Sequence, residues 1–191
     1  MANPPSDFRG VPPARNVWAA LRAANLGEGR EAEETHVDAG QRLAAIEEIR
    51  NLKARYFRYL DCKLWDDLRT VFTADMTVVT PGGDVWIEGG PAYAASLQSS
   101  LTSAVSCHQG LTAEIEVIDA SNATGIWAMQ DVIEWDEHHP RYEWKSIVGR
   151  GHYHETYRHD EGAWRIATLT LTRIRLDITW PDGHPNAATS S

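Results

Sequence analysis

Three side chains in the middle of the sequence have the types that general acid–base chemistry needs. Tyr56 and Asp61 lie near the C-terminal end of a run with helical periodicity, and His108 follows much later. If the fold brings Asp61 to His108, the carboxylate would orient the imidazole and make a general base for neutral pH. A lone His is more often structural, so spacing alone does not assign this role. Tyr56 and Asp61 point roughly 140° apart around a helix, so one pocket reaches both only at the helix end.

Two charged residues lie on apolar faces of predicted strands. Asp131 alternates with Trp127 and Met129 onto one face. An unpaired buried carboxylate costs several kcal/mol, so Asp131 has a partner, is protonated or faces a wet cavity. Arg173 alternates with Leu171 in the same way, and it either pairs with Asp131, binds a substrate carbonyl or carboxylate, or is turned outward by a bulge. We favour side chains that face a wet cavity and orient substrate.

Periodicity and turn residues predict an α+β fold with helices on one face of a curved, mostly antiparallel sheet. A long amphipathic helix is expected from about Leu43 to Leu60, and Pro91 opens another helix that ends near Ala104. Because Gly110 can interrupt the alternation of its strand, the face of His108 is not assigned. The remaining predictions are a short helix at 65–72 and strands at 76–80, 84–87, 109–118, 124–135, 142–157 and 164–178.

Composition narrows the class of protein. The chain has 191 residues, 42% hydrophobic, with eight Trp, which favours one domain with a substantial core. A net charge of -9 argues against a nucleic acid or an anionic membrane as partner. Cys62 and Cys107 are predicted to be reduced thiols, and no apolar stretch reaches the roughly 20 residues of a membrane span. Without an apolar signal-peptide core near the N-terminus, we expect a cytoplasmic protein.

The termini differ in composition from the middle of the chain. We predict a flexible arm over residues 1–38, a folded domain over 39–180 and a disordered tail over 181–191. The arm could instead wrap a neighbouring subunit. His152 and His154 alternate onto one strand face, but no third ligand is identifiable, so we expect no metal and no cofactor.

One stretch of the chain has a familiar pattern. The helix that ends in Tyr56-Phe57-Arg58-Tyr59-Leu60-Asp61, the following Trp65-Asp66-Asp67-Leu68, and the hairpin Tyr157–Ile166 with Gly162 and Trp164 carry it. Between about Gln41 and Ile178 the sequence resembles SnoaL-like proteins of the nuclear transport factor 2-like superfamily. Within that family it is similar to bile acid 7α-dehydratases and more distantly to scytalone dehydratases and hexachlorocyclohexane dehydrochlorinases.

The resemblance implies a cone-shaped α+β barrel with a deep apolar pocket, in a homotrimer or homodimer. It implies that His108 is the catalytic imidazole, Asp61 its carboxylate partner and Tyr56 the helix Tyr of the site. Asp131 and Arg173 then match substrate-orienting positions. The remaining expected substrate-binding residues are Tyr153, Trp127 and Met129.

These residues predict a lyase that needs no cofactor and dehydrates a hydrophobic hydroxy-carbonyl compound such as a steroid, terpenoid or polyketide. His108 would abstract the proton next to the carbonyl, and Tyr56 would hydrogen-bond the carbonyl or guide the leaving hydroxyl. Since one scaffold of this kind hosts many reactions, two alternatives stay open. They are an isomerase or cyclase that uses the same base, and a protein that binds a small molecule without catalysis.

Overall fold

A long helix begins the part of the chain that this computed structural model describes, residues 37–187. Helix α2 spans Ala39–Asp61 and starts with a capping box. The Asp38 carboxylate accepts a hydrogen bond from the Gln41 backbone N–H at 2.9 Å, and the Gln41 side chain accepts one from the Asp38 N–H at 3.1 Å. The predicted amphipathic helix is therefore confirmed, and its buried side chains include Ile49, Leu52, Tyr56 and Leu60.

Two short helices and a hairpin follow α2. They are α3 (Trp65–Arg69), β1 (Phe72–Val79), β2 (Val85–Glu88) and α4 (Gly90–Leu101). A proline in the first turn opens α4, as the sequence predicted, because its missing N–H needs no partner there. Strands β1 and β2 are antiparallel.

Four long strands complete the sheet: β3 (Ala104–Val117), β4 (Asn122–Trp135), β5 (Ser146–Asp160) and β6 (Ala163–Thr179). The strand order is β2-β1-β6-β5-β4-β3, and each neighbouring pair is antiparallel except β1 with β6. The α+β class is confirmed. Within residues 37–187 the sheet stays open, with β2 and β3 at its edges, so it is a curved half-cone rather than a closed barrel.

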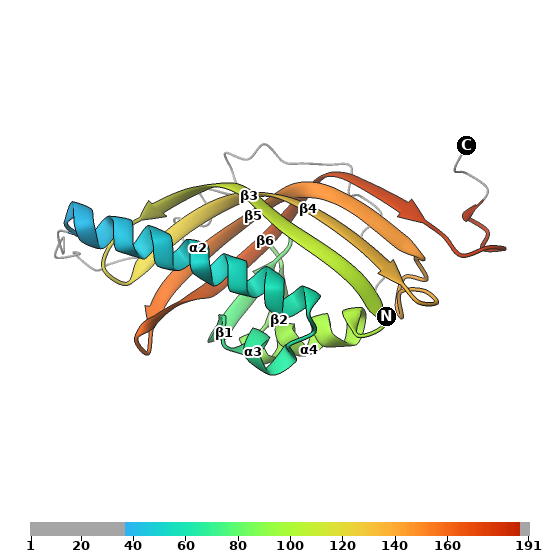
Figure 1. Ribbon diagram of the computed structural model, residues 1–191, viewed down its shortest axis with the longest axis horizontal. Coiled ribbons are helices and arrows are strands. Elements are labelled where there is room, and N and C mark those ends of the chain that lie inside the picture. The colour runs from blue at the N-terminus through green and yellow to red at the C-terminus, as the bar shows by residue number, and fades with distance from the viewer. Residues whose placement is uncertain (1–36, 188–191) are drawn as a thin grey trace.

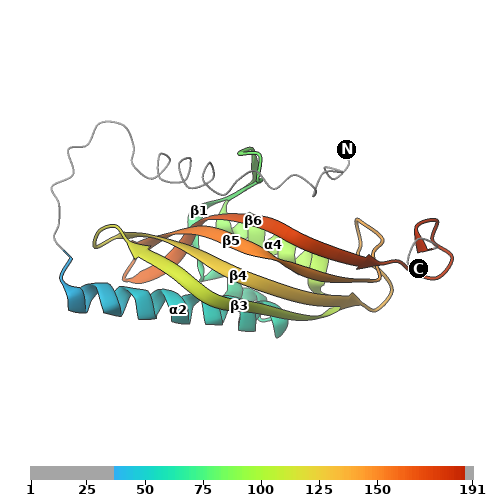
Figure 2. The same ribbon diagram turned by 90° about the horizontal axis from the view of Figure 1, so that it is seen from above.

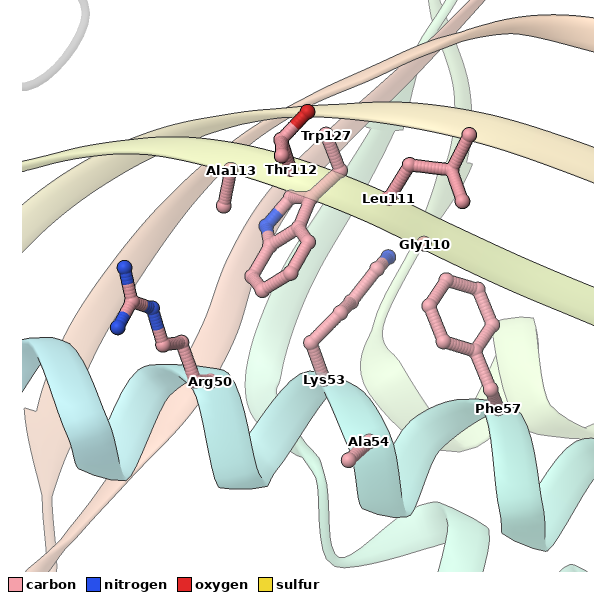
Figure 3. Close-up of a pocket in the computed structure, with 9 residues that line it drawn as sticks. All are labelled: Arg50, Lys53, Ala54, Phe57, Gly110, Leu111, Thr112, Ala113 and Trp127. Carbon is pink, nitrogen blue, oxygen red and sulfur yellow. The ribbon is translucent and has the colours of Figure 1, made fainter.

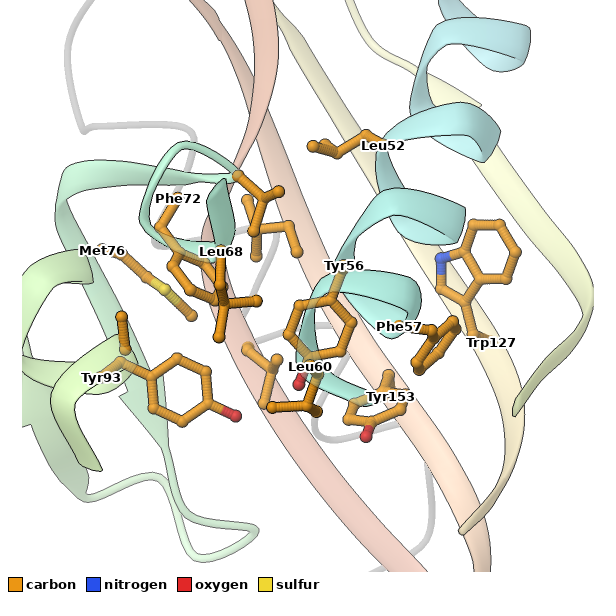
Figure 4. Packing of buried hydrophobic residues seen from close by; sticks show 14 of the residues in the cluster. Leu52, Tyr56, Phe57, Leu60, Leu68, Phe72, Met76, Tyr93, Trp127 and Tyr153 are labelled. Carbon is orange, nitrogen blue, oxygen red and sulfur yellow. The ribbon is translucent and has the colours of Figure 1, made fainter. Parts of the chain in front are cut away.

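The sheet arches over α2, and α3 and α4 lie on the same side (Figure 1). Seen from above, β3 to β6 run side by side across the helices (Figure 2). Apolar side chains fill the space between the helices and the sheet. Among them, Tyr56 lies between Tyr93 of α4 and Tyr153 of β5 (Figure 4). Its ring makes an edge contact with Tyr153, at 6.3 Å between centroids. Two of the predicted site residues, Tyr56 and Tyr153, thus meet on the concave side of the sheet.

Several element boundaries differ from the predictions. β3 begins at Ala104, so His108 lies inside a strand rather than just before one, and α4 ends at Leu101. Residues 136–145, expected to start a strand from 142, form a loop instead. Side chains satisfy its backbone: the Lys145 amine donates to the carbonyls of Trp135 and Asp136 at 2.7 and 2.8 Å.

The chain ends were predicted from composition alone. Residues 1–36 and 188–191 lie outside the described residues, so the predicted arm stays a prediction. Residues 181–187 form turns, in which the His184 ring stacks on Trp180 at 4.3 Å, so this part of the predicted tail has defined local structure. Cys62 and Cys107 are free thiols. None of the helices within 37–187 combines the length and apolar character that crossing a membrane requires.

Candidate active site

The end of α2 and the start of β3 bring Asp61 and His108 together. Asp61 is the last residue of α2, and its Oδ1 lies 2.7 Å from His108 Nδ1. Its Oδ2 accepts the His108 backbone N–H at 2.8 Å. No hydrogen bond within the described part of the chain engages the other ring nitrogen, Nε2, and His108 lines a cavity. The carboxylate thus fixes the ring with Nδ1 protonated and leaves Nε2 free to accept a proton.

Polar neighbours hold the Asp61 carboxylate in its charged form. Burial opposes the charge, but hydrogen bonds from the ring and backbone of His108 and from Ser106 outweigh it and lower the pKa of Asp61. The Ser106 hydroxyl donates to Oδ1 at 2.8 Å and accepts from the Lys63 amine at 2.9 Å. Sequence reasoning missed Ser106 and Lys63. The available signal was the position of Ser106 two residues before His108, on the same strand face.

A cavity of about 500 Å³ lies on the concave side of the sheet, next to His108. Four further residues predicted from the sequence line its wall. Asp61 does not line it but hydrogen-bonds to His108. Trp127 and Met129 do not line it, contrary to their predicted substrate-binding role. The predicted residues that line this cavity are His108, Tyr56, Asp131, Arg173 and Tyr153.

Asp131 and Arg173 bind one another across the wall of this cavity. Arg173 Nη1 donates to Asp131 Oδ1 at 2.7 Å and Nη2 donates to Oδ2 at 2.6 Å, a bidentate pair. Only 3% of the Asp131 side chain and 11% of the Arg173 side chain are exposed. Burial opposes the Arg173 charge, but the hydrogen bonds with Asp131 raise its pKa above the ordinary value. The favoured expectation that both address substrate rather than each other is therefore corrected: they face the cavity as a pair.

Glycine on β5 makes room for this pair. Asp131 lies beside Gly149 in the register of β4 and β5, and Arg173 reaches over the same residue from β6. A methyl group at position 149 would overlap Asp131 Oδ1 and Arg173 Nη1. A glycine inside a strand that marks such a close approach is a signal that the sequence reasoning did not use.

We expect Gly149→Ala to lower the free energy of unfolding by about 1–3 kcal/mol, because the new methyl group must push apart a buried ion pair. Urea denaturation measures this. Gly82→Ala is the matched control, since its nearest neighbours would be 3.7 and 3.9 Å away, and it should change stability by less than about 0.5 kcal/mol. Equal stability of the two variants would contradict the packing described for Gly149.

Three tyrosine side chains, one each from α2, α4 and β5, also line the cavity. Burial is the main reason why the pKa values of Tyr56 and Tyr153 lie well above the ordinary value, and it raises the pKa of Tyr93 to about 12. The hydroxyl groups of Tyr56 and Tyr93 also influence each other's pKa. These phenols therefore remain protonated near neutral pH and can donate hydrogen bonds. Tyr93, at the start of α4, was not recognised from the sequence.

Aromatic residues of the 136–145 loop also line the cavity. The His139 ring contacts Trp135, Tyr142 and Trp144, with centroids 4.7–5.6 Å apart. His139 Nδ1 accepts the backbone N–H groups of Arg141 and Tyr142 at 3.0 and 3.1 Å. A neutral imidazole thus organises the loop, because only the unprotonated nitrogen can accept.

Acid should destabilise this loop through His139. Burial lowers the pKa of His139 from 6.5 to about 4. Between these pH values the unfolded chain binds the proton more readily than the folded protein, so the free energy of unfolding decreases as the pH decreases. At pH 5 the loss relative to pH 7 should be about 1–2 kcal/mol. His139→Asn keeps an acceptor without titrating, so its melting midpoint should fall less than that of the wild type between pH 7 and pH 5. Parallel pH profiles for the two proteins would refute this assignment.

Trp127 lies at a second cavity, of about 440 Å³, between α2 and β3 (Figure 3). A bulge in β3 contributes to its wall: Gly110 pairs with Met129 and Ala113 with Trp127, so two residues of β3 oppose one of β4. This confirms that the alternation breaks at Gly110. Met129 lines neither cavity, and its sulfur lies 3.7 Å from Arg173 Nη1. The cavity next to His108 is called the reaction cavity below.

No metal centre is found among residues 37–187, where no three His, Cys, Asp or Glu side chains gather. The rings of His152 and His154 are 6.3 Å apart. The site combines an imidazole held by a carboxylate, a buried ion pair and several phenol hydroxyl groups. Such a set is suited to moving a proton on a small organic molecule.

Comparison with known proteins adds the family. A SnoaL-like domain matches residues 41–170. In structure the chain is similar to a candidate scytalone dehydratase from Novosphingobium aromaticivorans, with 16% identity and a TM-score of 0.62 over 76% of this chain and 98% of that one. It is also similar to a hexachlorocyclohexane dehydrochlorinase, with 18% identity and a TM-score of 0.60 over 76% and 99%. A Mycobacterium tuberculosis protein of unknown function has 25% identity and a TM-score of 0.58 over 70% and 73%. The chain belongs to the SnoaL-like domain family.

Proposed function

We propose that this protein is a lyase that needs no cofactor and removes water from a hydrophobic β-hydroxy carbonyl compound. The observation that carries the proposal is the His108–Asp61 pair, 2.7 Å apart, with the free Nε2 at a cavity lined by aromatic side chains. A volume of about 500 Å³ falls within the range of small-molecule pockets. The names of two structural neighbours, a dehydratase and a dehydrochlorinase, agree with an elimination.

In the proposed reaction, His108 Nε2 takes the proton from the carbon next to the carbonyl. The electron pair of that C–H bond forms the C=C bond, and the C–O bond to the hydroxyl group breaks. The hydroxyl group takes a proton from the His108 imidazolium and leaves as water, which regenerates the base. Asp61 stabilises the imidazolium between the two proton transfers.

The other cavity residues act on the carbonyl group and on the orientation of the substrate. In this proposal Tyr56, which lines the cavity, donates a hydrogen bond to the carbonyl oxygen as negative charge develops, and this lowers the barrier. Asp131 and Arg173 form a rigid polar wall that orients the substrate, and Tyr153 adds a second phenol. The resemblance to bile acid 7α-dehydratases makes a steroid the first substrate to test, ahead of terpenoids and polyketides.

Incubation with a panel of hydroxy-carbonyl steroids, terpenoids and polyketides in D₂O tests the proposal. Loss of one water from a panel member, detected by mass spectrometry, supports the lyase. Deuterium uptake next to the carbonyl without water loss would replace it with an isomerase or cyclase that uses the same base. A ligand recovered unchanged and without deuterium would replace it with a binding protein.

A further inference from the structure

A lysine lies fully buried on the apolar face of α2. Lys53 is 1% exposed, and its amine lies 2.5 Å from Glu155 Oε1 on β5, whose side chain is 0% exposed. Burial lowers the pKa of Lys53, and the charge and hydrogen bond of Glu155 oppose that effect. A buried ion pair of this kind is often no more stabilising than two packed apolar residues. Neither residue takes part in the proton transfer proposed above, so the pair calls for another role.

Two further residues fix the Glu155 carboxylate. Its Oε2 accepts the Tyr157 hydroxyl at 2.5 Å, and the Tyr157 oxygen accepts the Trp127 indole N–H at 2.7 Å. Figure 3 shows the Lys53 side chain rising from α2 toward the sheet, beside Trp127. The carboxylate is therefore held from the sheet side, and the ammonium group is held by the carboxylate.

The ammonium group of Lys53 lies over three aromatic rings. Its nitrogen is 3.7 Å from the ring centroid of Tyr153, 4.3 Å from that of Tyr56 and 4.8 Å from that of Phe57. Tyr56 and Phe57 follow Lys53 by three and four positions, which places all three on one helix face. Tyr56 and Tyr153 line the reaction cavity, whereas Lys53 and Glu155 do not. Tyr56 and Tyr153 therefore contact the ammonium group and also line the cavity.

A cation at a phenol ring attracts the electron-rich face of the ring and so fixes its position. We propose that Lys53, held by Glu155, is a positioning residue that fixes the rings of Tyr56 and Tyr153, so that their hydroxyl groups are aimed as donors at a negatively charged substrate oxygen. This inference rests on the proposed function, in which such an oxygen forms.

The test measures preference for an oxyanion without needing the substrate. Wild-type protein is titrated with 4-nitrophenol, at a pH where the free probe is mostly anionic, and with 4-nitrotoluene, a neutral probe of the same shape. The ratio of the two affinities reports the strength of the donors. In Lys53→Met combined with Glu155→Gln, which removes both charges and leaves none unpaired, the preference for 4-nitrophenolate should fall about tenfold.

Two further variants separate this effect from general loss of structure. Tyr157→Phe removes a hydrogen bond from the same network but leaves the ammonium group over the rings, so it should lower stability and keep the preference. Lys53→Arg with Glu155 retained should restore most of the preference. If the Met and Gln combination does not melt cooperatively, Lys53→Gln with Glu155→Gln keeps a hydrogen-bonded neutral pair, and the same loss is expected.

An unchanged probe ratio in a folded charge-free variant would overturn the inference. So would a wild-type protein that binds 4-nitrotoluene but not 4-nitrophenolate, because its phenols then do not address an oxyanion. Neither result bears on proton abstraction by His108, which deuterium uptake measures separately. Conversely, loss of the preference in the charge-free variant supports the inference even if no water is eliminated from any compound.

Discussion

Turnover should fall by about 10²- to 10⁴-fold when His108 is replaced by alanine, because the positioned base is then lost. Asp61→Asn should cost a similar factor. Its carboxylate lies 2.7 Å from Nδ1, and an amide in its place no longer fixes the tautomer or stabilises the imidazolium. The double variant should be little worse than either single one, since the two residues act as one unit. Turnover of the compound found by the mass-spectrometric screen measures all three.

The control for this series is His152→Ala. His152 lies on β5 and is not part of the cavity wall, so its loss should leave turnover near the wild-type level. Circular dichroism and melting curves must show that each variant is folded. Activity of His108→Ala within a few-fold of the wild type would remove the base from the mechanism.

Breaking the pair of Asp131 and Arg173 should cost about 3–5 kcal/mol of unfolding free energy in either single variant, Asp131→Ala or Arg173→Ala. Each change leaves a buried charge without its bidentate partner, at distances now of 2.6 and 2.7 Å. The double variant should be less destabilised than the sum of the two, because no unpaired charge remains. Chemical denaturation of the full cycle measures the coupling.

A second ion pair on β6 is a natural comparison. Arg175 binds Asp177 at 2.8 Å, but both side chains are about half exposed or more, at 65% and 48%. Removal of either should leave the denaturation midpoint nearly unchanged, since water solvates the remaining charge. Additive single effects for Asp131 and Arg173, or losses no larger than those at Arg175, would show that the buried pair does not stabilise the fold.

The local pattern of the sequence was enough to predict the elements and several of their faces. Spacing of apolar residues identified α2, and strict alternation put Asp131 and Arg173 on the inward faces of β4 and β6. Both signals succeed because a helix or strand repeats over a few residues, so that one sequence window contains the information. The same reasoning extended a strand back to Tyr142, because the side-chain hydrogen bonds that shape the 136–145 loop have no period.

By itself, then, the sequence determined the α+β class, the amphipathic helix that ends in Asp61, and the inward faces of the two central charges. Only the tertiary structure decided which of these groups meet. The contact of Asp61 with His108 depends on where β3 starts relative to the end of α2, and the bulge after Gly110 hides that register from local alternation. The pairing of Asp131 with Arg173 across Gly149, and of Lys53 with Glu155, joins residues on different elements. Such contacts are set by strand order and curvature, which are properties of the whole sheet rather than of any one segment.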